Sequence, residues 1–146
     1  MKNNKGFSLV ELIIVIAIMA ILIGIVAGAL APALIKYINK SRKSTDISNG
    51  DLIAKAVTTA LAEEAGFEAC TKTSYSSTEL CTDGNAFTDE THSTLGAASM
   101  KVKYGNSKGK DFTIEVDKAN NKCIVYANPT KNADDQVYPE QGKNYK

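Results

Sequence analysis

Apolar and polar side chains are distributed very unevenly along this chain. Between Phe7 and Ile35 the only polar side chains are Ser8 and Glu11, and lysines stand on both sides of this stretch. A helix needs about twenty apolar residues to cross the hydrocarbon core of a bilayer. The pattern therefore predicts a membrane-spanning helix over residues 7–35, followed by a polar part with a small core.

Three interpretations of the apolar run compete: a cleaved secretory signal, a permanent anchor, or a helix that spans the membrane first and is used elsewhere later. A secretory signal has an apolar region of roughly 7–15 residues before its cleavage site, and this run is about twice as long. Its best small-residue site, Ala29 to Ala31, is followed by Pro32. These features disfavour the secretory signal.

Glu11 is the feature that a plain anchor does not explain. An acidic residue at the centre of a membrane helix costs roughly 2.5–3.5 kcal/mol, and less near the interface, so the charge implies a partner. One partner is the free N–H groups at the start of its own helix. The other would be an amine on Phe7, four residues away, if the chain were cut after Gly6. That amine could belong to the same chain or to a neighbour in a staggered array of helices.

The stretch Lys5-Gly6-Phe7-Ser8-Leu9-Val10-Glu11-Leu12, with the long apolar run behind it, resembles the processing and assembly motif of type IV prepilins. The resemblance covers roughly the first forty residues. It implies a leader over residues 1–6, cleavage after Gly6 by a prepilin peptidase and methylation of the new N-terminal Phe7. It also implies that Glu11 neutralises that amine during subunit docking.

The resemblance further implies a homopolymer, built with an assembly ATPase and a platform protein. The subunit would lie in the bacterial cytoplasmic membrane before assembly and in an extracellular surface pilus afterwards, with adhesion, twitching motility or aggregation as functions. A pseudopilin of a type II secretion or competence (DNA uptake) system shares the whole motif and is the main alternative. A monomeric, membrane-tethered binding module is a third hypothesis.

Three residues in the second half of the apolar run disfavour a regular helix: Gly24, Gly28 and Pro32. Glycine lowers helix propensity by about 1 kcal/mol relative to alanine, and an interior proline costs about 3 kcal/mol. The segment could kink or loosen in a filament. A straight or gently bent helix whose small residues permit close packing is the equal alternative.

Residues 36–66 have the spacing of an amphipathic helix that continues the apolar one. Ile53, Val57 and Leu61 recur on one helical face. Asn49-Gly50 is a turn-type dipeptide that could interrupt the helix, and Gly66 is a candidate stop. Residues 67–99 lack periodicity and predict a loop, with at most a short helix near Glu90–Gly96. Within it, Cys70 and Cys81 could form a disulfide or remain two reduced thiols.

Residues 100–127 predict three antiparallel strands at 100–104, 112–116 and 122–126, because apolar and β-branched residues alternate or cluster there. Their candidate core positions are Val102, Tyr104, Phe112, Ile114, Val116, Ile124 and Tyr126. Cys123 is expected as a small core residue, and the tail 128–146 as irregular. The expected fold class is α+β, with the long helix packed on a small antiparallel sheet.

Composition and candidate chemistry narrow the function further. The 146 residues suit one domain, the net charge is +1, and Arg42 is the only arginine, so we expect no specific nucleic-acid partner. His92 is expected at the surface, and Asp134-Asp135 are expected as solvated acids rather than calcium ligands. No phosphate loop, triad spacing or metal-ligand set stands out, so we expect neither an enzyme nor a cofactor.

Overall fold

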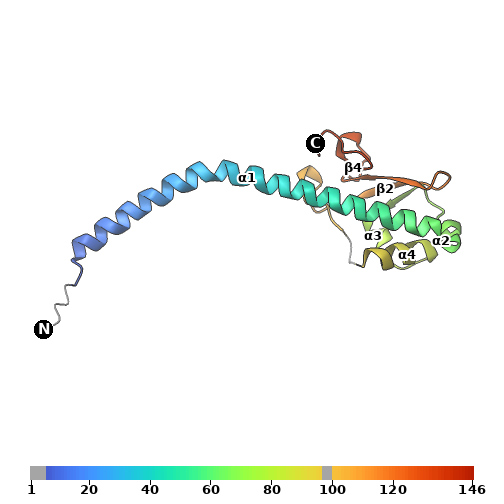
Figure 1. The fold of residues 1–146 in the computed structure, drawn as a ribbon, viewed down its shortest axis with the longest axis horizontal. Helices are drawn as coiled ribbons and strands as arrows, with labels where there is room; N and C mark the ends of the chain where they lie inside the picture. The colour runs from blue at the N-terminus through green and yellow to red at the C-terminus, as the bar shows by residue number, and fades with distance from the viewer. Residues whose placement is uncertain (1–5, 97–99) are drawn as a thin grey trace. The chain divides into compact units, whose positions relative to one another are not determined.

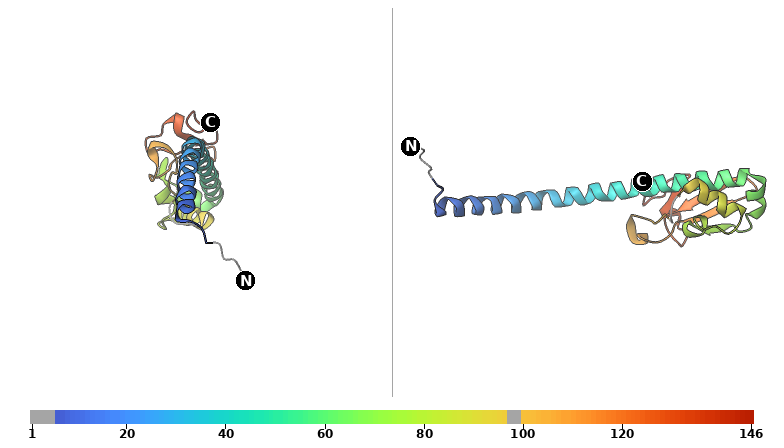
Figure 2. Two further views of the ribbon diagram at one scale, coloured as in Figure 1. Left: turned by 90° about the vertical axis from the view of Figure 1, so that its left-hand side faces the viewer. Right: turned by 90° about the horizontal axis from the view of Figure 1, so that it is seen from below.

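The computed structural model describes residues 6–96 and 100–146. It separates the chain into two compact units, Met1–Asn39 and Lys40–Lys146. We call the second unit the head. One helix, α1 (Leu9–Ala62), contributes to both units. Figures 1 and 2 trace it from its blue start to the green part that lies beside the strands of the head.

The head contains a four-stranded antiparallel sheet in the order β1-β2-β3-β4, which confirms the α+β class. Central pairing joins Glu115 of β2 to Ile124 of β3, and outer pairs join Tyr75 to Ile114 and Val125 to Tyr138. The elements after α1 are α2 (Glu64–Ala69), β1 (Ser74–Ser76), α3 (Ser77–Leu80), α4 (Ala86–Leu95), β2 (Thr113–Asp117), β3 (Lys122–Tyr126) and β4 (Gln136–Tyr138), with short 3-10 turns η1 (Gly105–Ser107) and η2 (Ala133–Asp135).

The core lies between the second part of α1 and the sheet. Ile53, Val57 and Leu61 are buried, as their spacing predicts, against a cluster that includes Ile114 and Val125. Alternation along β2 and β3 places one set of side chains toward α1. Of the other predicted core positions, Val102, Phe112, Val116, Cys123 and Tyr126 are buried, whereas Tyr104 and Ile124 are half-buried.

Helix α1 continues through the turn-type dipeptide Asn49-Gly50 without a break. A Cβ at Gly50 would lie 2.7 Å from Cγ2 of Val137, so β4 packs directly on the backbone of α1 at this point. Gly50 therefore serves close packing instead of ending the helix.

The predicted stop at Gly66 is wrong, because α1 ends at Ala62 and Gly66 lies inside α2. A Cβ at Gly66 would collide with the carbonyl oxygen of Ala60. Glycine there allows α2 to fold back closely against the end of α1. Glu63, between the two helices, has the extended backbone of a residue that begins a new helix.

The predicted loop at 67–99 is also wrong over the described residues, because they contain β1, α3 and the whole of α4. Both α3 and α4 begin with reciprocal capping boxes, Ser76 with Glu79 and Asn85 with Thr88. Helix α4 ends at Gly96, which has φ +61°, so the expected short helix near Glu90–Gly96 exists and starts earlier. Residues 97–99 lie outside the described part.

The predicted strand at 100–104 does not form, and only Lys101 makes an isolated bridge, to Asp111. The reason is competition for backbone donors: the N–H groups of Lys103 and Tyr104 donate to the carboxylate of Asp46, at 2.7 and 2.9 Å. Strand β1 occupies the place beside β2 instead. The tail 128–146 is less irregular than predicted, since it contains η2 and β4.

Candidate processing and assembly site

Gly6 and Phe7, the predicted cleavage site, precede the helix as exposed, irregular backbone. Nothing lies within 4 Å of a Cβ built on Gly6, and the side chain of Phe7 is 87% exposed. The peptide bond between them is therefore free of packing by any described residue. A protease needs such an open segment of chain.

Glu11 lies in the first turn of α1, where its Oε2 accepts a hydrogen bond from the N–H of Ser8 at 3.0 Å. Ser8 is the last residue before the helix, and its carbonyl accepts from the N–H of Leu12. The carboxylate thus satisfies one of the free donors at the helix start and meets the positive end of the helix dipole. No hydrogen bond joins Oε1 to any described residue, so the carboxylate keeps capacity for a second donor.

The apolar part of α1 has no packing partner in the described structure. All its large side chains from Leu9 to Ile35 are exposed, Ile16 at 57% for example. By length and composition this helix is able to cross a membrane. Burial of so large an apolar surface requires lipid or other apolar helices.

The predicted kink residues Gly24, Gly28 and Pro32 all lie inside α1, which is helical throughout. Nothing lies within 4 Å of a Cβ built on either glycine. No contact in the described residues therefore explains these glycines, and loosening of this segment in a filament stays a prediction.

Three cysteines are free, so the Cys70–Cys81 disulfide is not formed in this structure. The two side chains have different surroundings: the hydroxyl of Tyr75 lies 3.6 Å from Sγ of Cys70, whereas Cys81 lies near Met100 and Asp111. Burial raises the pKa of Cys81 and raises that of Cys123 to about 11, so neither thiol is activated. Cys123 is a core residue, as predicted.

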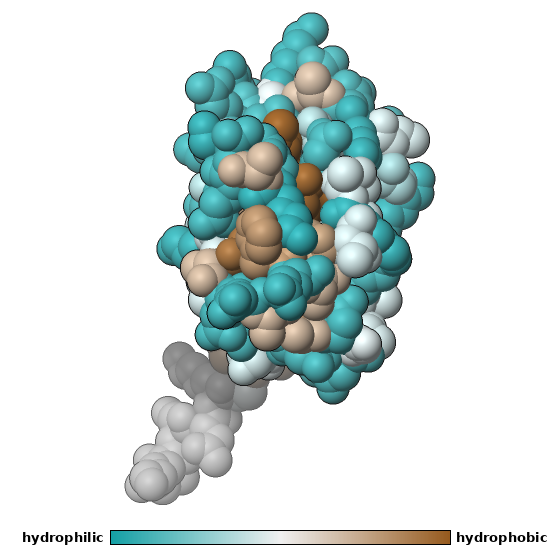
Figure 3. Space-filling model, turned by 90° about the vertical axis from the view of Figure 1, so that its right-hand side faces the viewer, coloured by the Kyte–Doolittle hydropathy of each residue, from teal (hydrophilic) through white to brown (hydrophobic). Residues whose placement is uncertain are grey.

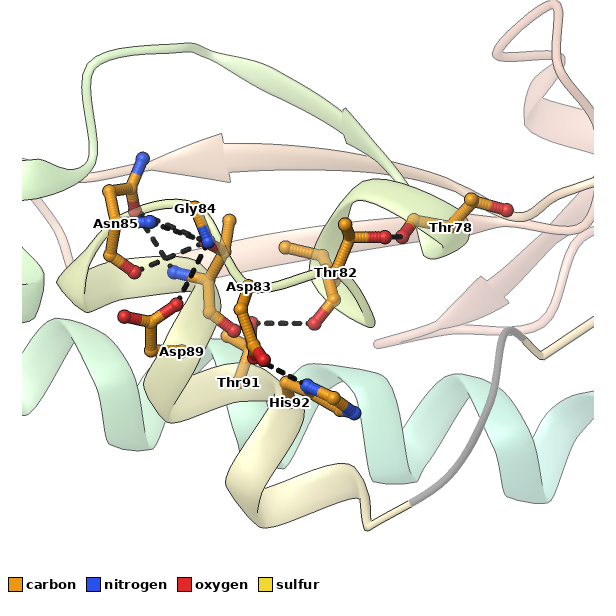
Figure 4. A network of polar contacts seen from close by, with 10 residues as sticks. Thr78, Thr82, Asp83, Gly84, Asn85, Asp89, Thr91 and His92 are labelled. Carbon is orange, nitrogen blue, oxygen red and sulfur yellow. Dashed lines mark hydrogen bonds and ion pairs between the residues drawn. The ribbon is translucent and has the colours of Figure 1, made fainter.

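His92, half-buried and expected at the surface, pairs its Nδ1 with Oδ1 of Asp83 at 2.6 Å (Figure 4). Around it, Thr82 donates to the carbonyl of Thr78, and the N–H of Gly84 donates to Asp89. The polar groups in this view hold the start of α4 and the turn before it. They form a structural network without a nucleophile paired to a base.

Of the two tail acids, Asp135 has amide partners and Asp134 is exposed. Asp135 accepts from the side-chain amides of Asn128 and Asn144, and Asp134 lies in η2. No group of three or more metal-ligating His, Cys, Asp or Glu side chains occurs among residues 6–96 and 100–146.

Asp46, a polar residue of the head that is fully buried on α1, has a role that was not predicted from the sequence. Besides the two backbone donors of Lys103 and Tyr104, it accepts from the hydroxyl of Tyr145 at 3.1 Å. Burial raises its pKa, against the effect of these hydrogen bonds. A signal was present, since Asp46 lies seven residues before Ile53, on the same helical face.

The end of the head that carries α2 has an apolar cleft. Its volume is about 830 Å³, and its lining includes Val116, Ile124 and Tyr138, with Lys72 and Lys118 among its polar residues. Figure 3 shows brown, apolar atoms gathered in the middle of this end and framed by teal, polar ones. The head thus presents a mixed surface, unlike the predominantly apolar helix of the other unit.

Residues 1–27 match the family model described as the prokaryotic N-terminal methylation motif, which is the signature of type IV pilins and prepilins. No curated protein and no solved structure matches the chain. The motif and the long apolar helix support a precursor of the type IV pilin or pseudopilin kind. Its motif implies processing by a prepilin peptidase and polymerisation into filaments. Membrane anchoring before assembly fits the same two features.

Proposed function

We propose that this protein is the structural subunit of a type IV pilus, cleaved between Gly6 and Phe7 and polymerised into a surface filament. The observation that carries the proposal is the apolar part of α1, which is exposed over its whole length and begins within the residues that match the methylation motif. In the membrane, lipid covers this surface. In the filament, the same surface packs against α1 of other subunits.

Glu11 supplies the register of that packing. Cleavage creates an amine on Phe7, and the carboxylate of Glu11 retains an oxygen for it beside its bond to Ser8. A neighbouring subunit with the correct stagger brings its Phe7 amine to Glu11, and both charges are then neutralised among apolar helices. A wrong stagger leaves both charges unpaired, which is costly in an apolar medium.

The proposed sequence of cleavage, membrane residence and polymerisation requires several partner proteins. A prepilin peptidase and methyltransferase matures Phe7, and an assembly ATPase acts through a platform protein in the membrane. Transfer of α1 from lipid to other helices gives little net hydrophobic gain, so packing, the Glu11 pair and the motor together drive extraction. We place the subunit in the cytoplasmic membrane before assembly and on the cell surface afterwards, where adhesion, motility or aggregation are its roles.

Mass spectrometry of the mature N-terminus tests the processing step. We expect a chain that begins at methylated Phe7. An intact Met1, or a cut after Ala31, would contradict the proposal. Recovery of long surface filaments made of this chain supports the pilus, whereas a processed chain that forms no surface filament indicates a pseudopilin.

Two variants separate the roles of Glu11. Glu11→Gln keeps an oxygen that accepts from Ser8 but removes the charge, whereas Glu11→Ala removes both. We expect each variant to reduce the filament yield by more than about tenfold, because the amine of Phe7 would be left without a partner among apolar helices. Normal yield with Glu11→Gln and reduced yield with Glu11→Ala would show that Glu11 acts only as a helix cap. Normal yield with both would contradict the proposed register role of Glu11, whereas a parent chain that forms no filament and stays monomeric would favour a membrane-tethered module.

A further inference from the structure

The head contains a second hollow, which is polar and separate from the apolar cleft. It has a volume of about 410 Å³, within the range of roughly 300–1,000 Å³ typical of small-molecule sites. Three parts of the chain form it: the turn η1, the segment from Ala127 to Asp135, and the C-terminal residues Asn144 and Tyr145. We call it the amide cavity.

The name reflects its lining, which contains the side chains of four asparagines: Asn106, Asn128, Asn132 and Asn144. Ser107, Asp135 and two tyrosines complete the set of polar groups. Among the described residues that line it there is no lysine, arginine or histidine. This chemistry does not favour an anionic ligand, which cationic side chains usually bind.

Its single carboxylate already accepts hydrogen bonds from two amide side chains. Oδ2 of Asp135 accepts from Nδ2 of Asn128 at 2.6 Å, and Oδ1 accepts from Nδ2 of Asn144 at 2.8 Å. Oδ1 of Asn132 accepts from the N–H of Asp134. These bonds hold the asparagine side chains in place before any ligand arrives, which lowers the entropic cost of binding.

Several hydrogen-bonding groups of the lining remain unused within the described part of the chain. Oδ1 of Asn144 is an acceptor and Nδ2 of Asn132 a donor without a partner there, and Asn106 is exposed on η1. Ser107 is more informative because it is a buried residue, only 7% exposed. Its hydroxyl bonds to no described residue, and no fully buried side-chain oxygen or nitrogen among the described residues lacks a partner, so this hydroxyl is accessible to solvent and to a ligand.

We propose that the amide cavity binds a neutral saccharide. Each sugar hydroxyl both donates and accepts, and so matches a lining in which unused amide donors, amide acceptors and a serine hydroxyl lie together with no cationic side chain. Tyr104 and Tyr145, whose ring centroids are 5.8 Å apart, also line the cavity, and the half-buried ring of Tyr104 can offer apolar contact to the C–H groups of a sugar ring. Recognition by polar groups that lack other partners discriminates strongly against ligands without hydroxyls.

Saccharide binding is independent of the proposed filament. Every lining residue belongs to the head, and none belongs to the apolar unit that would form the filament core. Loss of saccharide binding in a variant that still forms filaments would therefore be an effect on this cavity alone. Loss of filament assembly in Glu11→Gln, with saccharide binding retained, would be an effect on the filament alone.

The test uses full-length protein in a zwitterionic detergent without a sugar headgroup, and saturation-transfer NMR with free sugars. The probes are glucose, galactose, mannose, N-acetylglucosamine and N-acetylgalactosamine, with anionic N-acetylneuraminic acid for comparison. We expect saturation of at least one neutral sugar and none of the anionic one. Ser107→Ala should weaken that sugar's Kd by about fivefold to tenfold, as for one lost hydrogen bond.

Ser93→Ala is the matched control, because it removes the same atom from an exposed position on α4. We expect its Kd to equal that of the parent chain. Asn106→Ala, which changes only an exposed side chain, should weaken binding by a similar factor and covers the case in which Ser107→Ala disturbs the fold. Circular dichroism checks that both variants are folded. No saturation of any neutral sugar, or unchanged affinity in both variants, would overturn the proposal.

Discussion

The two units of this chain solve the burial of apolar surface in opposite ways. In the head, isoleucines such as Ile53 are fully buried against β-strands of the same chain, whereas Ile16 in the other unit is 57% exposed. The head therefore covers its own apolar core, whereas the apolar part of α1 requires lipid or other apolar helices to cover it. A subunit that first resides in a membrane and then enters a polymer needs this combination.

The largest expected difference between the units comes from an identical substitution in each. Ile53→Ala should lower the free energy of unfolding of the head by about 2–5 kcal/mol, because it leaves a cavity in the core. Ile16→Ala should leave it unchanged, since Ile16 packs on nothing in the described structure. Urea unfolding of full-length protein in detergent, followed by circular dichroism, measures both. A large loss with Ile16→Ala would show that the two units are not independent.

Asp46 provides the next comparison, between a buried and an exposed acid on the same helix. Asp46→Ala removes three hydrogen bonds and leaves two backbone N–H groups and the hydroxyl of Tyr145 unpaired. We expect a loss of about 3 kcal/mol. Asp51→Ala, at an exposed position of α1, should change stability by less than about 0.5 kcal/mol. Equal effects of the two substitutions in the same unfolding assay would contradict a role for Asp46 in holding the C-terminus.

Glycines also distinguish the units. Gly50→Ala should cost the head about 1–3 kcal/mol, because the new methyl group would lie 2.7 Å from Val137 and displace β4. Gly28→Ala meets nothing within 4 Å and should leave the thermal midpoint of the head unchanged. Amide hydrogen exchange should show faster exchange in residues 136–138 for Gly50→Ala only. Unaltered exchange there would refute the proposed close packing.

The smallest expected effects concern the pH dependence of stability. Two acids of the head, Asp46 and Glu79, have pKa values shifted in opposite directions. The pKa of Asp46 is raised by burial, so its contribution to stability is fully present below its unfolded pKa and is lost as pH rises through its folded pKa. The pKa of Glu79 is lowered by its hydrogen bonds to Lys72 and Ser76, so its contribution is present above its unfolded pKa and is lost on acidification.

We therefore expect Glu79→Gln to reduce the loss of stability between about pH 5 and pH 3, by no more than about 1 kcal/mol because the Lys72 pair is solvent-exposed. Asp111 shifts in the same direction, since hydrogen bonds from Lys101, Thr78 and Ser77 lower its pKa by more than burial raises it. Unfolding curves at several pH values measure the change. A Glu79→Gln variant with the same acid sensitivity as the parent chain would refute this assignment.

Much of the architecture could be predicted from local patterns. The apolar run, the face of Ile53, Val57 and Leu61 and the strand at Lys122–Tyr126 depend on periodicity alone, and the structure has all of them. The prediction of a loop over residues 67–99 was wrong because the helices there depend on capping boxes of polar side chains, such as Asn85 with Thr88, rather than on apolar spacing. Tyr104 lies in a segment with the alternation of a strand, but its N–H donates a hydrogen bond to Asp46, which is 58 residues away in the chain.

Local patterns in the sequence are enough to identify the N-terminal segment of this protein, up to Ile35. Residues 1–27 carry the methylation motif, and a helix in an apolar medium needs only length and composition to be recognised. Tertiary structure alone decided the head. Three of its features join residues that are distant in the chain. Asp46 accepts a hydrogen bond from Tyr145, Gly50 packs against Val137, and four asparagines line one cavity with Ser107. Such contacts follow from the packing of elements on one another, which no local pattern encodes.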